Sequence, residues 1–265
     1  QIGLKEVISQ NIHKIPSELV FLAQNFSVLK PGGEMGIILP AGLISGVRWR
    51  GFREFLLSQY SVQSCIQLPS DAFKNTEAST FAISLKNRRA SSNTVSLSHL
   101  KYSSPCEISI QDAIERMDYS FYSCPSARNL GIDAIPIEAI IRGNKTDSEL
   151  RRGKTKYLHT NSLVDGFSEI DGSIQKISDD TKFAQAGDIL IARVGSRCIG
   201  RIALLTSGKL PITDCLFAVR SKNTELWPAL KKSEIIKTLK SSALGVGAKY
   251  LTLGTIRELF HGRKI

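Results

Sequence analysis

Apolar positions in the first forty residues change from helical to strand-like spacing. Between residues 17 and 29 they recur every three or four positions, which predicts a one-sided helix capped by Ser17. The stretch LKPGG at residues 29–33 should stop that helix, because proline cannot continue it and glycine accepts left-handed dihedral angles. The apolar run at residues 35–40 is then typical of a buried parallel strand.

A second helix and two more strands follow the same pattern. The helix is expected over roughly residues 47–59, the strands at 62–68 and 80–85, and these two strands should pair as a hairpin. Helices alternating with strands indicate the α/β class. Three strands are too few for a doubly wound sheet covered on both faces, so this half of the chain is interpreted as truncated.

The pattern changes after residue 86. Residues 86–105 are polar and serine-rich, with one weak alternating run at 94–100. Beyond them the strand-like segments are short and separated by glycine or proline turns, with helices expected near 227–239 and 255–260. We therefore predict two domains. Residues 1–105 would form the C-terminal half of an α/β sheet with its linker, and residues 106–265 a β-rich α+β domain with C-terminal helices.

Positive charge is concentrated in the second half of the chain. The net charge is +11 in total, yet residues 1–140 hold 13 Lys+Arg against 12 Asp+Glu, while residues 141–265 hold 22 against 12. The two halves therefore carry +1 and +10. Such asymmetry suits a phosphate-backbone partner, because each neutralised phosphate releases condensed counterions, although many basic domains are simply solvated.

Several classes of protein are disfavoured by the composition. No apolar run approaches the roughly 20 residues that span a bilayer, and the first ten residues lack a signal-peptide pattern, so no membrane or export role is expected. The five cysteines form no Cys-x-x-Cys pair and the four histidines are scattered, which predicts reduced cytoplasmic thiols and no metal site. No nuclease signature and no Ser/His/Asp or Cys/His set is found.

The order of motifs in residues 15–87 resembles the catalytic domain of adenine-N6 DNA methyltransferases. A helix, LKPGG, GIILP, a second helix, CIQLP and TFAISLKN occur in that sequence, with Phe73 in the last loop. The resemblance is to modification subunits of type I restriction systems and related single-chain enzymes. It implies that Phe73 stacks on an adenine swung out of the duplex, where an aromatic face returns part of the lost stacking energy. The alternative is that Phe73 fills the end of the sheet.

Two motifs of that family are missing from the sequence. The family binds S-adenosylmethionine through a glycine-containing loop and performs the chemistry with an Asn/Asp-Pro-Pro-Tyr/Phe motif. In the family's usual order both precede the part represented here, so Gln1 is interpreted as a cut within a longer parent, and no catalytic or cofactor-binding residue is assigned. Gly245 and Gly247 follow a helix and lack the third glycine of a cofactor loop, so they are interpreted as a turn.

A second set of motifs resembles a target-recognition unit of a type I specificity subunit, over about residues 115–262. It begins at 115–122, resumes at KYLHTNSLVDG and AGDILIARVGSRCIGRIALL, and ends at LGVGAKYLTLGTIREL. Two groups of side chains in it are candidates for contacts to DNA, because guanidinium and ammonium groups bind phosphates and guanidinium can also pair with guanine. The first group is Arg193, Ser196, Arg197 and Arg201, and the second is Arg151, Arg152, Lys154, Lys156 and Tyr157.

Together these observations predict sequence-specific recognition of double-stranded DNA for adenine-N6 methylation in a restriction-modification-type system. The expected partners are duplex DNA, the N-terminal part of the parent methyltransferase, which would bind S-adenosylmethionine, and a restriction subunit. The fragment alone is expected to be inactive. The alternatives are a non-catalytic DNA specificity protein with a degenerate methyltransferase-like platform, and an RNA or small-molecule methyltransferase, for which the second resemblance would be accidental.

Overall fold

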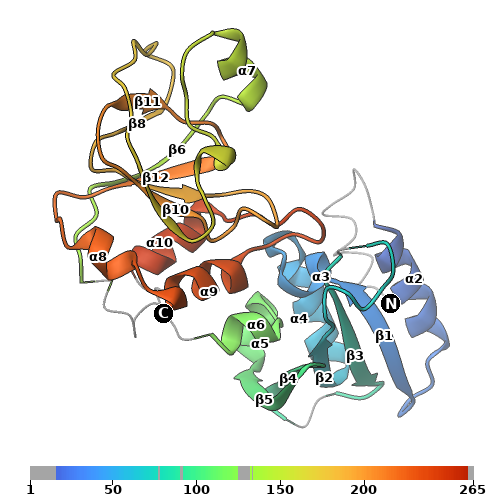
Figure 1. Cartoon of the computed structure of the whole chain (residues 1–265). Helices are drawn as coiled ribbons and strands as arrows, with labels where there is room; N and C mark the ends of the chain where they lie inside the picture. The colour runs from blue at the N-terminus through green and yellow to red at the C-terminus, as the bar shows by residue number, and fades with distance from the viewer. Residues whose placement is uncertain (1–15, 77, 90–91, 125–131, 133, 262–265) are drawn as a thin grey trace. The chain divides into compact units, whose positions relative to one another are not determined.

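The computed structural model describes residues 16–76, 78–89, 92–124, 132 and 134–261. These form two compact units. Unit 1 consists of Gln1–Ser123 together with Leu244–Gly247, and unit 2 of Cys124–Ala243 together with Ala248–Ile265. The two units are described separately (Figure 1).

Unit 1 is built on a five-stranded mixed sheet. Its strands are β1 (Glu34–Pro40), β2 (Ser61–Gln67), β3 (Thr80–Lys86), β4 (Thr94–His99) and β5 (Tyr102–Ser109), in the spatial order β1-β3-β2-β4-β5. Strand β3 pairs antiparallel with both β1 and β2, which confirms the predicted hairpin-type pairing. Strand β4 runs parallel to β2 and antiparallel to β5. The predicted α/β class is confirmed.

Helices cover one face of this sheet (Figure 1). They are α2 (Ser17–Val28), α3 (Ala41–Ser45), the 3-10 turn η1 (Val47–Trp49), α4 (Arg50–Gln59), α5 (Ile110–Glu115) and α6 (Tyr119–Tyr122). Alternate residues of β3, namely Phe81, Ile83 and Leu85, point into the core formed with these helices. On the opposite face, small side chains such as Ala82 and Ser84 line an open groove. The core therefore lies on one side of the sheet.

A fully buried arginine joins three of these helices. Arg53 of α4 donates to the main-chain oxygens of Leu43 and Gly46, at 3.0 and 2.9 Å, and to those of Ile114 and Glu115, at 2.8 and 2.6 Å. Burial lowers its pKa to about 10, which leaves the guanidinium charged at neutral pH. Because each of the three guanidinium nitrogens donates to a carbonyl, the charge is tolerated in the core.

Two local expectations for the start of the chain are wrong. Strand β1 is an edge strand whose exposure alternates, with Ile38 52% exposed, and its neighbour β3 is antiparallel rather than parallel. The apolar run predicts burial on both faces, but only one face of β1 meets the core. Helix α2 is preceded by Pro16, and no side chain caps it, so Ser17 is its first residue rather than its cap.

The serine-rich stretch is part of unit 1 rather than a linker. Residues 94–99 and 102–109 form the hairpin β4–β5, so the predicted division after residue 105 falls inside β5. The motif at residues 115–122 also belongs to unit 1. Its Met117 is fully buried in the core of unit 1 and donates its main-chain N–H to Ile44 O at 3.0 Å. The start of the predicted recognition domain must therefore move beyond Ser123.

Unit 2 contains a second five-stranded mixed sheet and a small two-stranded one. The larger sheet has the order β6-β12-β9-β10-β7, and the smaller pairs β11 with β8. The strands are β6 (Ala139–Arg142), β7 (Phe167–Ile170), β8 (Phe183–Gln185), β9 (Ile189–Ala192), β10 (Ile202–Leu205), β11 (Lys209–Pro211) and β12 (Leu216–Arg220). Only β7 and β10 are parallel within the larger sheet. The β-rich character predicted for this part of the chain is confirmed.

Both faces of the larger sheet are packed, and each strand alternates between two cores. In β9, Ile189 and Ile191 enter one core while Leu190 and Ala192 enter the other. The helices α8 (Leu226–Leu230), α9 (Ser233–Ser242) and α10 (Leu253–His261) contribute to the first core. The second core is closed by residues of the loops and of β8 and β11. Two-sided burial explains why β9, β10 and β12 are short, nearly continuous apolar runs.

The C-terminal helices differ from the predicted ranges at one point. The helix expected over 227–239 is two helices, α8 and α9, because the chain leaves helical dihedral angles at Lys231 and Lys232. The helix expected over 255–260 is α10. No helix in the described ranges is both long and apolar enough to cross a membrane.

Candidate nucleic-acid interface

Phe73 lies at the surface of unit 1, in the loop between β2 and β3. Its exposed fraction is 41%, so it does not fill the end of the sheet. An ion pair braces the loop before Phe73, and a left-handed residue turns the chain after it. Lys101 Nζ donates to both carboxylate oxygens of Asp71 at 3.1 Å, and Asn75 adopts a left-handed conformation with φ of 62°. An exposed aromatic ring on a braced loop is suited to stacking, and its role in base flipping remains a prediction.

The second predicted group of unit 2 lies on helix α7 (Asp147–Arg152) and the loop after it. A capping box begins this helix: Thr146 Oγ1 accepts from Glu149 N at 3.3 Å, and Glu149 Oε2 accepts from Thr146 N at 2.7 Å. Two hydrogen bonds therefore satisfy donors at its start. The helix is only six residues long, so this cap contributes substantially to holding it.

Asp147 organises two of the five predicted side chains in this group. Its carboxylate accepts from Arg151 Nη2 at 2.6 Å and from Tyr157 Oη at 2.7 Å. The Tyr157 hydrogen bond, followed by the charge of Arg151, lowers the pKa of Asp147. Arg151 is nevertheless largely exposed, at 74%, so its guanidinium remains available to solvent and to a polyanion.

The other three cations of the group project from the end of α7 and the loop after it. Arg152, Lys154 and Lys156 are all exposed. Lys154 has a positive φ of 53°, a conformation that costs a non-glycine residue about 1–2 kcal/mol. Its main-chain N–H donates to Arg151 O at 3.2 Å, which closes the turn after the helix. The structure thus brings the predicted group of five together on one helix and its following loop.

The first predicted group divides into supporting and exposed residues. Arg193 is an inward-facing support, with its side chain 14% exposed. Its Nε donates to Asp214 O at 2.6 Å, and its Nη2 lies 4.0 Å from the Asp214 carboxylate. Burial lowers the pKa of Arg193, and the like charge of Arg142 lowers it further. In this arrangement Arg193 holds the strand-turn in place.

Arg201 has a similar supporting position at the other end of the turn. Its Nε donates to Asp165 at 2.7 Å, and Nη1 lies 3.4 and 3.3 Å from the main-chain oxygens of Thr160 and Leu163. The side chain is 22% exposed. These contacts tie β10 to the loop before β7.

Ser196 and Arg197 are the exposed members of this group. The turn that carries them depends on Gly195, whose φ of 107° is unfavourable for other residues. Its main-chain N–H donates to Lys249 O at 2.9 Å, so the segment before α10 braces the turn. The predicted tight turn is present.

A chain of neighbouring charged and polar groups connects the two groups. Asp214 accepts from Arg193, and the adjacent Cys215 has its pKa raised by burial, then by Asp214, and also by Asp147. Asp147 is the first residue of α7 and accepts a hydrogen bond from Arg151. Asp214 N also donates to Lys145 O at 2.8 Å, which places the strand-turn next to the segment that leads into α7. The "basic surface" is defined as Arg151, Arg152, Lys154, Lys156, Tyr157, Ser196 and Arg197.

One structural ion pair within a predicted DNA-binding motif was missed by the sequence reasoning. Asp188, in the segment GDILIAR, is 1% exposed and accepts from Arg220 Nε and Nη2 at 2.8 and 2.7 Å. It also accepts from Gln185 N at 2.9 Å. No local pattern signals this pair, because its partners lie 32 residues apart, one just before β9 and the other on β12. The acidic residue of this motif therefore stabilises the fold.

The structure offers no centre for metal chemistry within the ranges it describes. No three His, Cys, Asp or Glu side chains there are grouped to hold a metal ion. All five cysteines have free thiols. The cations and hydroxyl groups of the basic surface can make ionic contacts and hydrogen bonds to an anion.

A comparison with protein families decides what unit 1 is similar to. Residues 8–110 match the N-6 DNA Methylase family. This confirms the resemblance to adenine-N6 DNA methyltransferases that was drawn from residues 15–87. The matched range ends within α5, so it leaves the resemblance of unit 2 to a target-recognition unit as a prediction. A search of curated proteins found no match.

Three solved structures with similarity to the chain come from restriction-modification systems. One, described as the structural basis of complex assembly and conformational transition of the type I R-M system, is 24% identical over 35% of this chain and 20% of that chain, with a TM-score of 0.30. The M protein of type I restriction enzyme EcoKI is 17% identical over 32% and 20%, with a TM-score of 0.29. The type IIG restriction endonuclease BpuSI is 12% identical over 97% and 44%, with a TM-score of 0.40. The chain spans a fifth of the first two chains and under half of the third.

Proposed function

We propose that this chain recognises a specific sequence in double-stranded DNA for adenine-N6 methylation in a restriction-modification-type system. The observation that carries the proposal is the joining, in one chain, of residues that match N-6 DNA Methylase to a unit with a strongly basic surface. A methyl donor and a duplex are the two substrates of that chemistry. Unit 2 supplies exposed cations on a folded domain, and these can bind the phosphates of a duplex.

The catalytic step requires groups from outside these 265 residues. S-adenosylmethionine would be bound, and the adenine amine would be contacted, by the N-terminal part of the parent methyltransferase, which is a proposed partner together with a restriction subunit. Within this chain, Phe73 would face the extruded adenine. Stacking on its ring would offset part of the cost of unpairing and hold the base while the amine is methylated.

Recognition is divided among the residues of unit 2 according to their contacts. Arg151, Arg152, Lys154 and Lys156 would bind phosphates, which receive most protein–DNA hydrogen bonds. Ser196 and Arg197, at the tip of a tight turn, are the better candidates for base edges. Arg193 and Arg201 would act by holding that turn, since carboxylates and carbonyls already engage both of them.

The test is transfer of labelled methyl groups to duplex DNA, followed by nucleoside analysis of the product. The complete parent enzyme should form N6-methyladenine at one sequence context, whereas residues 1–265 alone should form none. Methyl transfer by the isolated chain would contradict the assignment of catalysis to the N-terminal part of the parent. A complete parent that binds DNA but never methylates adenine would identify a specificity protein with a methyltransferase-like platform instead.

A further inference from the structure

Residues 193–195 and 249–251 of unit 2 pair as a short antiparallel ribbon, which is called the ribbon. Two main-chain hydrogen bonds hold it together, from Gly195 N to Lys249 O at 2.9 Å and from Leu251 N to Arg193 O at 2.8 Å. The second segment belongs to the motif LGVGAKYLTLGTIREL, no residue of which has been assigned a contact to DNA. The ribbon therefore joins this motif to the strand-turn that carries the candidate base contacts.

The pairing pattern places the side chain of Tyr250 on the outer face of the ribbon. Val194 and Tyr250 lie opposite each other, between the two hydrogen bonds. The side chains of such a pair share one face, and those of the next pair along the strands lie on the other face. In that next pair, Arg193 is 14% exposed and Leu251 is fully buried in the core of unit 2. Tyr250, with an exposed fraction of 38%, therefore points outward.

The turn that carries Ser196 and Arg197 is attached to the end of the ribbon. Both residues are exposed, and Ser196 follows the first strand of the ribbon directly. Ser196 Oγ accepts from Lys249 N at 3.4 Å, so the start of the turn is tied to the strand that carries Tyr250. Main-chain pairing thus holds Tyr250 beside the two proposed base-contacting residues.

The width and the chemistry of the ribbon match the major groove of duplex DNA. That groove admits a two-stranded β-ribbon, and each base pair presents hydrogen-bonding groups in it. The apolar group that base pairs present there is the C5 methyl group of thymine. Serine and arginine side chains suit the hydrogen-bonding groups, whereas an aromatic ring suits the methyl group. The excess of cations in unit 2, 23 Lys+Arg against 14 Asp+Glu, would attract the ribbon to a polyanion.

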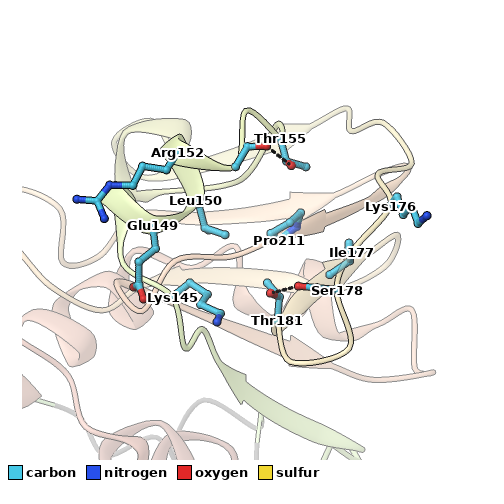
Figure 2. Close-up of a pocket in the computed structure, with 11 residues that line it drawn as sticks. Lys145, Glu149, Leu150, Arg152, Thr155, Lys176, Ile177, Ser178, Thr181 and Pro211 are labelled. Atoms are coloured by element: carbon cyan, nitrogen blue, oxygen red, sulfur yellow. Dashed lines mark hydrogen bonds between the residues drawn. The ribbon is translucent and has the colours of Figure 1, made fainter.

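The cavity beside α7 in the same unit lacks a comparable arrangement. Figure 2 shows the charged ends of Arg152 and Lys176 pointing away from the cavity and away from each other. Lys145, a third cation of its lining, is paired with Asp180. These cations do not converge on a ligand, so the ribbon is the better candidate for contacts beyond the basic surface.

We propose that the ribbon enters the major groove at the target site and that the ring of Tyr250 packs against the methyl group of one thymine. Tyr250 is then a specificity-determining residue that acts beside the hydrogen bonds of Ser196 and Arg197. The inference rests on the proposed function. It adds to that function a residue from the last motif and the kind of base that this residue distinguishes.

The test combines variants of the full chain with deoxyuridine, which differs from thymidine by the loss of the C5 methyl group. A labelled duplex carries the sequence at which the complete parent methylates adenine, and each thymine of the site is replaced in turn. Fluorescence anisotropy gives the dissociation constants. Tyr250→Phe keeps the ring, whereas Tyr250→Thr removes it and keeps a residue that favours strands. Tyr102→Thr, which removes an exposed tyrosine of unit 1, is the matched control.

At one thymine, deoxyuridine should weaken binding by the unmodified chain about threefold to tenfold, which is the scale of one buried methyl group. Tyr250→Phe and the control Tyr102→Thr should show the same loss. Tyr250→Thr should bind the thymine duplex more weakly and show no further loss with deoxyuridine at that position. Its salt slope should equal that of the unmodified chain, because the substitution removes no charge.

Three results would overturn the proposal and leave DNA recognition intact. The first is a deoxyuridine effect that Tyr250→Thr retains in full. The second is equal weakening of cognate and scrambled duplexes by Tyr250→Thr, which would make Tyr250 a backbone contact. The third is the absence of a deoxyuridine effect at every thymine in the unmodified chain, a result that depends on no variant. Absence of duplex binding by the unmodified chain would instead overturn this proposal and the proposed function together.

Discussion

At the scale of single residues, burial separates arginines that the sequence cannot distinguish. Arg193, Arg197 and Arg201 lie within nine positions of one another, and all suit phosphates or guanine by chemistry. In the structure two of them meet carboxylates and carbonyls, and only Arg197 is exposed. Residue type and spacing were sufficient to locate the strand-turn. They were insufficient to assign roles, because the partners come from distant segments.

The buried pair of Asp188 and Arg220 should be worth far more to folding than an exposed pair of the same type. We expect Asp188→Ala to lower the free energy of unfolding by about 3–5 kcal/mol, because it leaves a guanidinium partly buried without its partner. The matched control is Asp165→Ala, which removes a carboxylate that is 84% exposed and pairs with Arg201; its cost should be about 1 kcal/mol or less. Urea denaturation measures both, and equal losses would contradict the structural role of Asp188.

Phe73 should matter to methylation and not to folding. In the complete enzyme, Phe73→Ala should lower the methylation rate by about tenfold or more, because stacking on one base is worth about 1–3 kcal/mol. Duplex affinity should change much less. The control is Phe21→Ala, which truncates another exposed phenylalanine of unit 1, on α2. Single-turnover methylation and anisotropy separate the effects, and an unchanged rate for Phe73→Ala would remove its proposed role.

At the scale of elements, strong periodicity predicted the helices and central strands well. It did not predict the polar strands β4 and β5 or the one-sided burial of the edge strand β1. Strand β4 carries Ser and Thr on its outer positions, and β5 begins in a serine-rich stretch, so local composition favoured a linker there. Long-range pairing with β2 overrides that preference. The apolar run of β1 was similarly ambiguous, since periodicity alone does not tell one-sided from two-sided burial.

The capping box of α7 should support DNA binding without contributing charge. Thr146→Ala removes one of its two hydrogen bonds and should cost about 1 kcal/mol of stability, so Arg151 and Arg152 would be held less firmly. We expect weaker duplex binding than in the unmodified chain. Ser109→Ala, which removes the side-chain cap of α5 in unit 1, is the control and should leave duplex affinity unchanged. An effect of equal size in both variants would show that α7 has no special part in binding.

At the scale of the whole molecule, the structural division preserves the charge asymmetry seen in the sequence. Unit 1 holds 12 Lys+Arg against 10 Asp+Glu, and unit 2 holds 23 against 14, so they carry +2 and +9. Moving the boundary from residue 105 to residue 123 therefore leaves the inference about DNA intact. The boundary itself was unpredictable from composition, because residues 106–123 complete the core of unit 1 through contacts with residues far earlier in the chain.

The central claim is that unit 2 recognises duplex DNA through phosphate contacts from α7 and its loop, and base contacts from the turn at Ser196 and Arg197. The most direct measurement is titration of the full chain and its variants against cognate and scrambled duplexes at several salt concentrations. Binding by the unmodified chain should weaken steeply with salt. Lys154→Gln or Lys156→Gln should weaken both duplexes alike and flatten the slope by about 1, whereas Arg197→Gln should mainly reduce the preference for the cognate duplex, by about 1–3 kcal/mol. Equal losses on both duplexes for Arg197→Gln would make it a backbone contact, and salt-insensitive or absent binding by the complete parent would contradict DNA recognition itself.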